Sequence, residues 1–458
     1  MLKIHNTLTR QKETFTPIHP DKINIYICGV TVYDYCHLGH ARTYTSADVI
    51  IRYLRFSGFD VNYVRNITDI DDKIINRARE NNETVTSVTD RFTSAMHEDF
   101  AALQLLQPDH EPRATQYIPQ MIALIEKIIT NKHAYVASNG DVYFDVRSFK
   151  QYGCLSHHNI EELESGARVE INDVKQDPLD FALWKIAKPD EPAWDSPWGK
   201  GRPGWHIECS AMSMGLLGEH FDLHGGGRDL IFPHHENEIA QSVAATKNKF
   251  ANVWVHGGFL QIDKEKMSKS LGNFVTIRDM LRDHAPETLR YLLLASHYRS
   301  ALVYTDDVLQ QSSQALARFY TALRFLPDAT RAENTTYEKE FIEAMDDDFN
   351  TPIALSVLFE LAHEIQRLRE KNVQAAAQHG ALLRYLGDVL GILQTDPELF
   401  FQMGSGVDTR KIEELIAARE AARKQKNWAE ADRVRDELLK MNIAIEDGAG
   451  GTAWKVVK

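Results

Sequence analysis

Two short apolar runs separated by an amphipathic helix constrain the fold more than any other feature of this chain. Residues 22–29 (KINIYICG) form an apolar, β-branched run that ends at a glycine, and residues 60–65 form another. Between them, residues 38–56 carry apolar side chains at helical spacing and end just before Gly58, a residue type that commonly stops helices. Two buried strands joined by a helix predict a βαβ unit with parallel strands.

The alternation of helix and strand is interrupted once and then resumes. Residues 146–204 mix glycine, proline, charge and tryptophan with weak periodicity, which indicates an insertion. Helical and strand patterns then continue in turn at 207–217, 221–223, 234–247 and 252–256. Nearly everything after Thr276 has helical periodicity. We therefore expect an α/β fold: a Rossmann-like parallel-sheet catalytic domain with a connecting insertion, followed by an all-α bundle and a small C-terminal α+β module.

Size and composition narrow the class of protein. A chain of 458 residues exceeds what one hydrophobic core usually organises, so several domains are expected. With 43% hydrophobic and 26% charged residues and no apolar run of membrane-spanning length, we expect no membrane association. The N-terminus lacks the apolar core of a secretory signal, and four cysteines are too few for a disulfide framework, which predicts a cytoplasmic protein.

The segment His37-Leu38-Gly39-His40 follows the first predicted strand and opens the predicted helix. A helix N-terminus attracts phosphate through its free N–H groups and its dipole, and Gly39 lets a nucleotide approach the backbone closely. The two imidazoles, three residues apart, share one helical face and can donate to phosphate oxygens. Alone, the segment is weak evidence, because a capped helix that carries incidental histidines explains it as well or better.

A second polar segment, Lys266-Met267-Ser268-Lys269-Ser270, follows a predicted strand much further along the chain. Alone it could be a solvated run of charge. In this order and in a split α/β core, however, the two segments match the two signature motifs of class I aminoacyl-tRNA synthetases. Amino-acid activation needs no enzyme nucleophile, only positioning of ATP and neutralisation of the developing pyrophosphate charge. We therefore predict His37, His40, Lys266 and Lys269 as catalytic, ATP-binding residues.

Four further side chains form a chemically coherent set of metal ligands. Cys28 ends the first strand, Cys209 lies early in a helix, and His234 and Glu238 lie one turn apart on another. Two thiolates, an imidazole and a carboxylate are all accepted zinc ligands. Spacing cannot join ligands so far apart in sequence, and a cysteine on a buried strand is commonly just a small apolar residue. The residues alone leave both interpretations open.

Over essentially its whole length the chain resembles the cysteinyl-tRNA synthetase family. The resemblance rests on the two signature motifs and on four specific strings: 65–73 (RNITDIDDK), 204–209 (GWHIEC), 224–227 (HGGG) with Asp229, and 232–238 (FPHHENE). One departure is Leu38 in HLGH, an apolar change that keeps both histidines and the glycine. The resemblance implies ATP-dependent ligation of L-cysteine to tRNA(Cys) through a cysteinyl-adenylate.

The resemblance also implies a zinc ion, one per chain, held by Cys28, Cys209, His234 and Glu238, with Mg²⁺ accompanying ATP. Zinc can take the substrate thiolate as an added ligand, which favours sulfur over the hydroxyl of serine. An apolar pocket alone separates near-isosteres by only about 10- to 200-fold. By the same resemblance, Thr68, Trp205 and Asp229 hold the amino acid, although Trp205 could be a core residue and Asp229 a helix cap. Cys36 and Cys154 have no such pattern and are expected to be free thiols outside the site.

The C-terminal segment is locally basic. Residues 409–458 carry eleven basic and nine acidic side chains, whereas the whole chain has a net charge of -13. Cations that meet phosphate, an aromatic ring that stacks on a base and a carboxylate that accepts from base amino groups suit an unstacked anticodon. The resemblance predicts anticodon binding here, with contacts from Arg423, Trp428, Asp432 and Asp447. A solvated helical hairpin with Trp428 as its core anchor is the alternative.

These inferences give a domain plan and two rival functions. We expect a catalytic domain in two halves, residues 1–125 and 205–260, with a connecting insertion at 126–204 between them. A stem-contact region with the second signature is expected at 261–305, a helical bundle at 306–402 and an anticodon-binding module at 403–458. A cysteine ligase acting on an amino-sugar acceptor shares the adenylation chemistry, but its relatives lack the RNA-binding tail. A noncatalytic RNA- or metal-binding paralogue would be free to lose the signature histidines and lysines, which are all present. Family resemblance favours a monomer.

Overall fold

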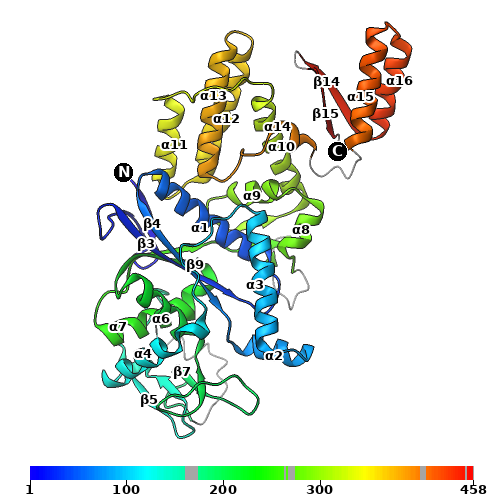
Figure 1. The fold of residues 1–458 in the computed structure, drawn as a ribbon. Coiled ribbons are helices and arrows are strands. Elements are labelled where there is room, and N and C mark those ends of the chain that lie inside the picture. The colour runs from blue at the N-terminus through cyan, green and yellow to red at the C-terminus, as the bar shows by residue number, and fades with distance from the viewer. Residues whose placement is uncertain (160–173, 263–264, 267–273, 403–408, 449–450, 457–458) are drawn as a thin grey trace. The chain divides into compact units, whose positions relative to one another are not determined.

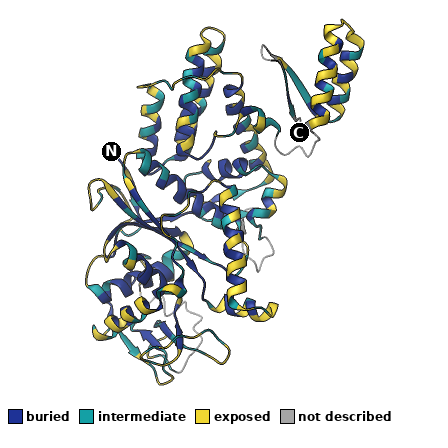
Figure 2. Ribbon diagram, viewed as in Figure 1, coloured by how far each residue is buried: buried dark blue, intermediate teal, exposed yellow. Residues whose placement is uncertain are grey.

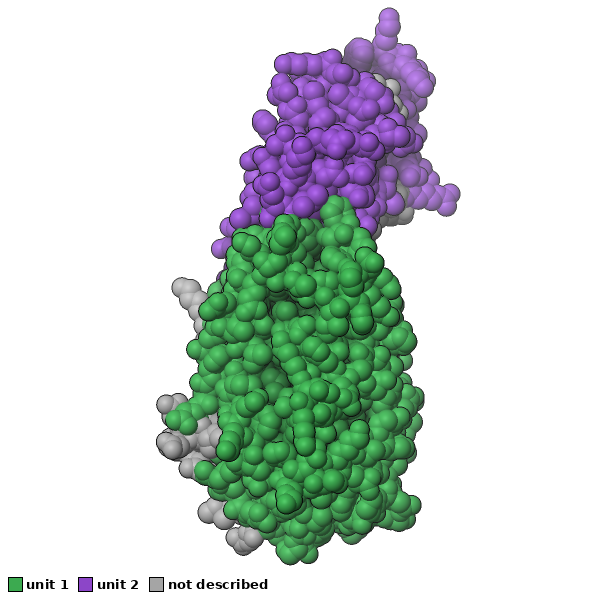
Figure 3. Space-filling model, turned by 90° about the vertical axis from the view of Figure 1, so that its left-hand side faces the viewer, with its two compact units in different colours: residues 1–277, 296–304, 344–351 green, residues 278–295, 305–343, 352–458 purple. Residues whose placement is uncertain are grey.

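The computed structural model describes residues 1–159, 174–262, 265–266, 274–402, 409–448 and 451–456. The chain divides into two compact units, coloured green and purple in Figure 3. The first unit contains residues 1–277, 296–304 and 344–351, and the second contains residues 278–295, 305–343 and 352–458. No helix among the described residues is long and apolar enough to span a membrane.

The first unit is built on a four-stranded parallel sheet in the order β10-β9-β3-β4. Its strands are β3 (Lys22–Thr31), β4 (Asp60–Thr68), β9 (Phe221–Gly227) and β10 (Ala251–Gly257). Their apolar runs are almost wholly buried because helices cover the sheet (Figure 2). Two strands precede the insertion and two follow it, so the predicted split, Rossmann-like core is confirmed.

Helices line both faces of this sheet (Figure 1). α1 (Leu38–Phe56) joins β3 to β4 with the predicted bounds. Ser57 caps its C-terminus, and Gly58 follows with a φ of +91°, a conformation that favours glycine. Other helices and helical turns among the described residues of this unit are α2 (Asp72–Asn81), α3 (Val85–Ala102), η1 (Ala114–Tyr117), α4 (Ile118–Thr130), α6 (Trp205–Leu217), η3 (Arg228–Leu230), η4 (Ile231–His235) and α7 (Glu236–Thr246).

Several short strands lie outside the parallel sheet. The insertion contains a four-stranded antiparallel sheet, β5 (Ala134–Val136), β6 (Val142–Phe144), β7 (Phe181–Ile186) and β8 (Gly201–Pro203), after which α6 returns to the core. A 3-10 turn, η2 (Val146–Ser148), follows β6. At the N-terminus, β1 (Lys3–Asn6) pairs with β2 (Gln11–Thr14).

A third small sheet joins β11 (Leu260–Ile262) to β12 (Glu265–Lys266) and to β13 (Leu302–Tyr304). β13 lies in a region predicted to be almost entirely helical. It is only three residues long and pairs in parallel with β11, so no local periodicity could reveal it.

The second unit is mainly helical, as predicted. Its described helices, three of which have end residues assigned to the first unit, are α8 (Ile277–Asp283), α9 (Pro286–Leu294), α10 (Asp306–Leu323), α11 (Thr336–Asp346), α12 (Thr351–Arg369), α13 (Val373–Val389), α14 (Pro397–Gln402), α15 (Thr409–Lys424) and α16 (Trp428–Lys440). The hairpin of β14 (Ile443–Gly448) and β15 (Gly451–Val456) follows α16. Trp454 and apolar residues of α15 and α16 form a small separate core there.

Candidate active site

The N-terminus of α1 is capped by the two signature histidines. Nδ1 of His37 accepts from the N–H of Gly39 at 3.0 Å, and Nδ1 of His40 accepts from the N–H of His37 at 3.1 Å. The two rings stack with centroids 3.7 Å apart. Because both Nδ1 atoms accept, each neutral ring carries its proton on Nε2 and presents a donor there. The helix end therefore offers two N–H donors of the kind that bind phosphate oxygens.

The backbone ties the second signature to the first. The N–H of Leu38 donates to the carbonyl of Val275 at 3.1 Å, and the N–H of Ile277 donates to the carbonyl of Cys36 at 2.9 Å. The stretch that follows the second signature is thus hydrogen-bonded to the residues of the first. Lys266 lies in β12, whereas Lys269 lies outside the described residues.

A buried cluster of thiol, imidazole and carboxylate groups lies where β3, α6 and α7 meet. Sγ of Cys28 lies 3.6 Å from Nε2 of His234 and 3.3 Å from Oε1 of Glu238. Nε2 of His234 is 3.1 Å from the same oxygen. His235 also joins the cluster, with its Nε2 3.3 Å from Sγ of Cys28. One ligand atom from each of these four residues lies within 4.8 Å of the others.

Cys209, the fourth predicted ligand, is not one of these four residues. Its thiol is 1% exposed and lies 3.7 Å from Oδ1 of Asn66, and it acts electrostatically on His234. Bond lengths of 2.0–2.3 Å place neighbouring ligand atoms of a tetrahedral zinc ion roughly 3.3–3.8 Å apart. The separations measured between Cys28, His234 and Glu238 are close to that range. The residues present therefore fit a tetrahedral metal with sulfur, nitrogen and oxygen ligands.

The electrostatics of the cluster also suit a cation. Burial alone would raise the pKa of Glu238, but His224 and His234 hold it well below the usual range. Burial would lower the pKa of His234, yet the Glu238 carboxylate and Cys209 outweigh it and raise that pKa to about 10. The Glu238 carboxylate is thus ionised, and it keeps His234 protonated. A divalent cation would supply the same charge and release that proton.

An outer ring of histidines orients these ligands and was not predicted from the sequence. Nδ1 of His206 lies 2.9 Å from Nδ1 of His234, and Nε2 of His224 lies 2.8 Å from Oε2 of Glu238. Nδ1 of His235 lies 2.7 Å from Nε2 of His256. Such partners fix the tautomer and orientation of metal ligands. The sequence held one signal for these residues: His206, His224 and His235 lie within the strings that carry the family resemblance, whereas His256 does not.

Two of the three predicted amino-acid contacts lie beside the cluster. The Trp205 ring stacks on His234, with centroids 4.2 Å apart, and is 37% exposed, so it is not a core residue. Oγ1 of Thr68 donates to Oε2 of Glu208 at 3.0 Å and accepts from Nδ2 of Asn66 at 3.2 Å. Oδ1 of Asn66 in turn accepts from the N–H of Gly29 at 2.7 Å.

The same network explains why position 29 is glycine. A Cβ there would lie 1.6 Å from the carbonyl oxygen of Asn66, so only glycine fits between β3 and β4 at this point. Asp229, the third predicted contact, is exposed in the turn η3, and its Oδ1 lies 2.5 Å from where a Cβ on Gly227 would be. It lines a cavity beside the sheet rather than the cluster itself.

Some of the predicted RNA contacts in the C-terminal module are exposed, and others form ion pairs within the module. Trp428 is 59% exposed, whereas Trp454 is 4% exposed and anchors the core, so the alternative role of Trp428 as core anchor is wrong. Asp447 accepts both guanidinium N–H groups of Arg419 at 2.8 Å and one from Arg423 at 2.6 Å. Asp432 is exposed on α16. Trp428 is the one large aromatic residue of the described module that is open to a base.

Comparison with known families matches almost the whole chain. Residues 14–314 match the tRNA synthetases class I (C) catalytic domain, residues 340–394 a DALR domain, and residues 409–454 the cysteinyl-tRNA ligase anticodon binding domain. The chain is 57% identical to a cysteine–tRNA ligase of Haemophilus influenzae over 99% of this chain and 100% of the relative. It is 59% identical to a cysteine–tRNA ligase of Halorhodospira halophila over 99% of both chains.

Solved structures with far lower identity share the fold. A Mycobacterium tuberculosis methionyl-tRNA synthetase in complex with methionyl-adenylate superposes with a TM-score of 0.58 at 14% identity, covering 83% of this chain and 91% of the other. An Agrobacterium radiobacter leucyl synthetase in a ternary complex gives a TM-score of 0.57 at 10% identity, covering 86% of each chain. With a class I catalytic domain, a dedicated anticodon module and this identity over its full length, the chain belongs to the cysteinyl-tRNA synthetase family.

Proposed function

We propose that this chain catalyses the ATP-dependent ligation of L-cysteine to tRNA(Cys) through a cysteinyl-adenylate. The observation that carries the proposal is its similarity over its full length to cysteine–tRNA ligases, including the anticodon binding domain at residues 409–454. The buried thiol, imidazole and carboxylate cluster near the histidine-capped helix supports cysteine as the amino acid. We further propose that the enzyme acts as a monomer in the cytoplasm.

In the first step the cysteine carboxylate attacks the α-phosphorus of ATP and pyrophosphate leaves. His37 and His40 would donate through Nε2–H to phosphate oxygens at the N-terminus of α1, where the helix dipole adds to their effect. Lys266 and Lys269 would neutralise the charge that develops on pyrophosphate, with Mg²⁺ bound to ATP. The hydrogen bonds between 36–38 and 275–277 would keep the two groups of donors together.

We propose that Cys28, Cys209, His234 and Glu238 hold a zinc ion, with His235 as an alternative nitrogen ligand. When bound, this ion would supply a soft Lewis acid that prefers the sulfur of cysteine to the oxygen of serine. Trp205, stacked on His234, would cover the amino acid. Thr68, held by Asn66 and Glu208, and Asp229 would contact its carboxylate and ammonium groups.

In the second step the terminal ribose hydroxyl of the RNA attacks the adenylate. We propose that the ranges 1–125 and 205–260 form the catalytic domain around the insertion at 126–204. The range 261–305 would contact the RNA stem, 306–402 would form a helical bundle, and 403–458 would bind the anticodon. Arg423, Trp428, Asp432 and Asp447 would line that last surface. The match of 409–454 to an anticodon binding domain argues against an amino-sugar acceptor.

The test is a pair of assays on the purified chain. Cysteine-dependent exchange of labelled pyrophosphate into ATP reports the first step, and charging of total tRNA reports the second, with serine and glucosamine as competing substrate and acceptor. We expect cysteine and tRNA to react and serine and glucosamine to fail. Exchange without charging of tRNA, or ligation to the amine alone, would overturn the proposal.

A pair of matched variants tests the assigned chemistry. Lys269→Ala is expected to slow exchange by about 10²- to 10³-fold, the usual effect of removing one stabilising donor. Lys249→Ala removes an exposed ammonium group that follows α7 and should leave exchange unchanged. Equal exchange rates in the two variants would refute the role of Lys269.

A further inference from the structure

Arg42 is a buried cation on α1 to which the proposed reaction assigns no role. It lies two residues after His40 and is 1% exposed. Burial lowers the pKa of Arg42 to about 10, so the guanidinium still carries its charge at neutral pH. A buried charge is costly unless several hydrogen bonds satisfy it. The acceptors around this guanidinium therefore show which part of the chain it holds.

The guanidinium of Arg42 binds the backbone of the segment 296–300. Nη1 and Nη2 both donate to the carbonyl of Ser296 at 3.2 Å, and Nη2 also donates to the carbonyl of His297 at 2.6 Å. The carbonyl of Ser300 accepts from the same Nη2 at 3.4 Å. Three carbonyls of one short segment thus converge on a single side chain. Because these bonds come from a charged donor, they fix the path of the backbone there.

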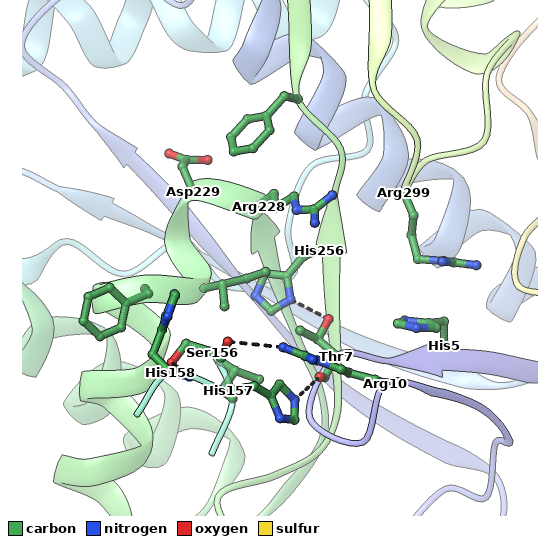
Figure 4. Close-up of a pocket in the computed structure, with 14 residues that line it drawn as sticks. His5, Thr7, Arg10, Ser156, His157, His158, Arg228, Asp229, His256 and Arg299 are labelled. Atoms are coloured by element: carbon green, nitrogen blue, oxygen red, sulfur yellow. Dashed lines mark hydrogen bonds between the residues drawn. The ribbon is translucent and has the colours of Figure 1, made fainter. Parts of the chain in front are cut away.

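Asp348 holds the same segment through its side chains. Oδ1 of Asp348 accepts from the Tyr298 hydroxyl at 2.8 Å, and Oδ2 accepts from Nε of Arg299 at 2.6 Å. Oδ1 also accepts from the N–H of His5 in β1 at 2.9 Å. His5 and Arg299 lie on the same side of the cavity that Asp229 lines (Figure 4). Two buried charges from different parts of the chain therefore hold the segment.

The backbone leads directly from this segment to the second signature. The N–H of Gly258, just before β11, donates to the carbonyl of Tyr298 at 2.7 Å. β13 follows the segment and pairs with β11, and β11 pairs in turn with β12. In this sheet Gln261 of β11 lies between Val303 of β13 and Lys266 of β12. The backbone of Lys266 is thus two strands away from the chain that the guanidinium holds.

We propose that Arg42 is a positioning residue for amino-acid activation, which sets the strand that carries Lys266 relative to the histidine-capped end of α1. The hydrogen bonds between 36–38 and 275–277 join α1 to the chain after the second signature. The bonds of Arg42 join the same helix to the sheet that carries the chain before it. The second signature is thereby anchored to α1 on both sides. This inference rests on the proposed function, because it names what aligns the two motifs assigned to ATP.

The test is a double-mutant cycle in cysteine-dependent pyrophosphate exchange. Arg42→Gln should lower the kcat of exchange about 10- to 100-fold, the scale expected when a catalytic group is misplaced by about 1 Å. The KM for cysteine and the metal content should stay at wild-type values, because Arg42 does not contact the cluster. Lys266→Ala should slow exchange by about 10²- to 10³-fold. If Arg42 acts by placing Lys266, the double variant should be no slower than Lys266→Ala to within about twofold.

Arg52→Gln is the matched control on the same helix. Arg52 pairs with Asp48 at 2.9 Å and donates to the carbonyl of Gln104, so its loss disturbs α1 but not the segment 296–300. Exchange in this variant should stay at the wild-type rate.

Tyr298→Phe provides a milder second test, which remains available if Arg42→Gln does not fold. It removes one hydroxyl that Asp348 accepts from and should slow exchange about 3- to 10-fold, as expected for one hydrogen bond. This effect should also vanish when Lys266 is replaced by alanine.

A general loss of stability predicts a different pattern, because its effect would multiply with that of Lys266→Ala. Multiplied effects in the double variants, wild-type exchange in Arg42→Gln and Tyr298→Phe, or an equal loss in Arg52→Gln would each overturn the inference. Wild-type exchange in Lys266→Ala would remove the role assigned to that lysine and the inference with it. A wild-type chain without cysteine-dependent exchange would instead refute the proposed function, so the two failures are distinguishable.

Discussion

The Glu236 carboxylate fastens the loop 153–156 to the helix that carries Glu238. It accepts from the backbone N–H groups of Gly153, Leu155 and Ser156 at 2.9, 3.1 and 2.8 Å, and it is 0% exposed. Glu236→Gln keeps the size of the side chain but replaces one accepting oxygen with an amide NH₂ group, which cannot accept. At least one of these bonds must then be lost, and the loop should open more often.

The size of the change in the free energy of loop opening follows from the kind of hydrogen bond that is lost. A hydrogen bond to a charged group contributes about 1.5–3 kcal/mol, and a buried donor left without a partner costs a similar amount. Local opening of the loop should therefore become easier by about 1.5–3 kcal/mol, which corresponds to a roughly 10- to 150-fold faster exchange of its amide hydrogens. The rest of the first unit should be unaffected because the change is local.

Hydrogen–deuterium exchange of peptides that cover 153–156 measures this directly. Glu126→Gln makes the same chemical change at an exposed position of α4 and should leave the loop at the wild-type rate. If the loop in Glu236→Gln exchanged no faster than in Glu126→Gln, the carboxylate would not be what holds it.

Two other variants test residues near each substrate. Asn66→Ala removes the amide that joins Gly29 to Thr68, so it should raise the KM for cysteine in pyrophosphate exchange several-fold while the KM for ATP stays constant; a parallel rise in both would contradict this role. Trp428→Ala should weaken tRNA binding by about 1–3 kcal/mol, roughly 5- to 150-fold, the usual contribution of one stacked base, without changing exchange; wild-type tRNA affinity would show that no base stacks there.

The sequence could predict the elements whose signals are local. The bounds of α1 coincide with those predicted because this helix has a long apolar periodicity and a clear end. The strands β7, β8 and β13 have three to six residues and pair with distant partners. No local pattern distinguishes such short strands from loops, so only the tertiary structure reveals them.

The same limit holds for the site: the sequence shows the residue types, and only the tertiary structure shows which of them are in contact. Residue types and family strings pointed to Cys28, Cys209, His234 and Glu238, but nothing in their spacing could show that Cys28 and His234, 206 positions apart, lie 3.6 Å from each other. His235 was missed as a member of the cluster because two adjacent histidines on one turn cannot be ranked without their surroundings. Trp428 and Trp454 have the same chemistry, and only packing shows which is buried.

The central claim is that a bound metal, held by this cluster, lets the enzyme recognise sulfur. Its most direct test is the metal content of chain purified without chelators, measured together with cysteine- and serine-dependent exchange. Cys154→Ser serves as the control for Cys209→Ser, since Cys154 is a free thiol outside the cluster. The account predicts one zinc per chain in the wild type and in Cys154→Ser, and loss of both zinc and cysteine-dependent exchange in Cys209→Ser. Metal-free wild-type protein that still activated cysteine and rejected serine would contradict it.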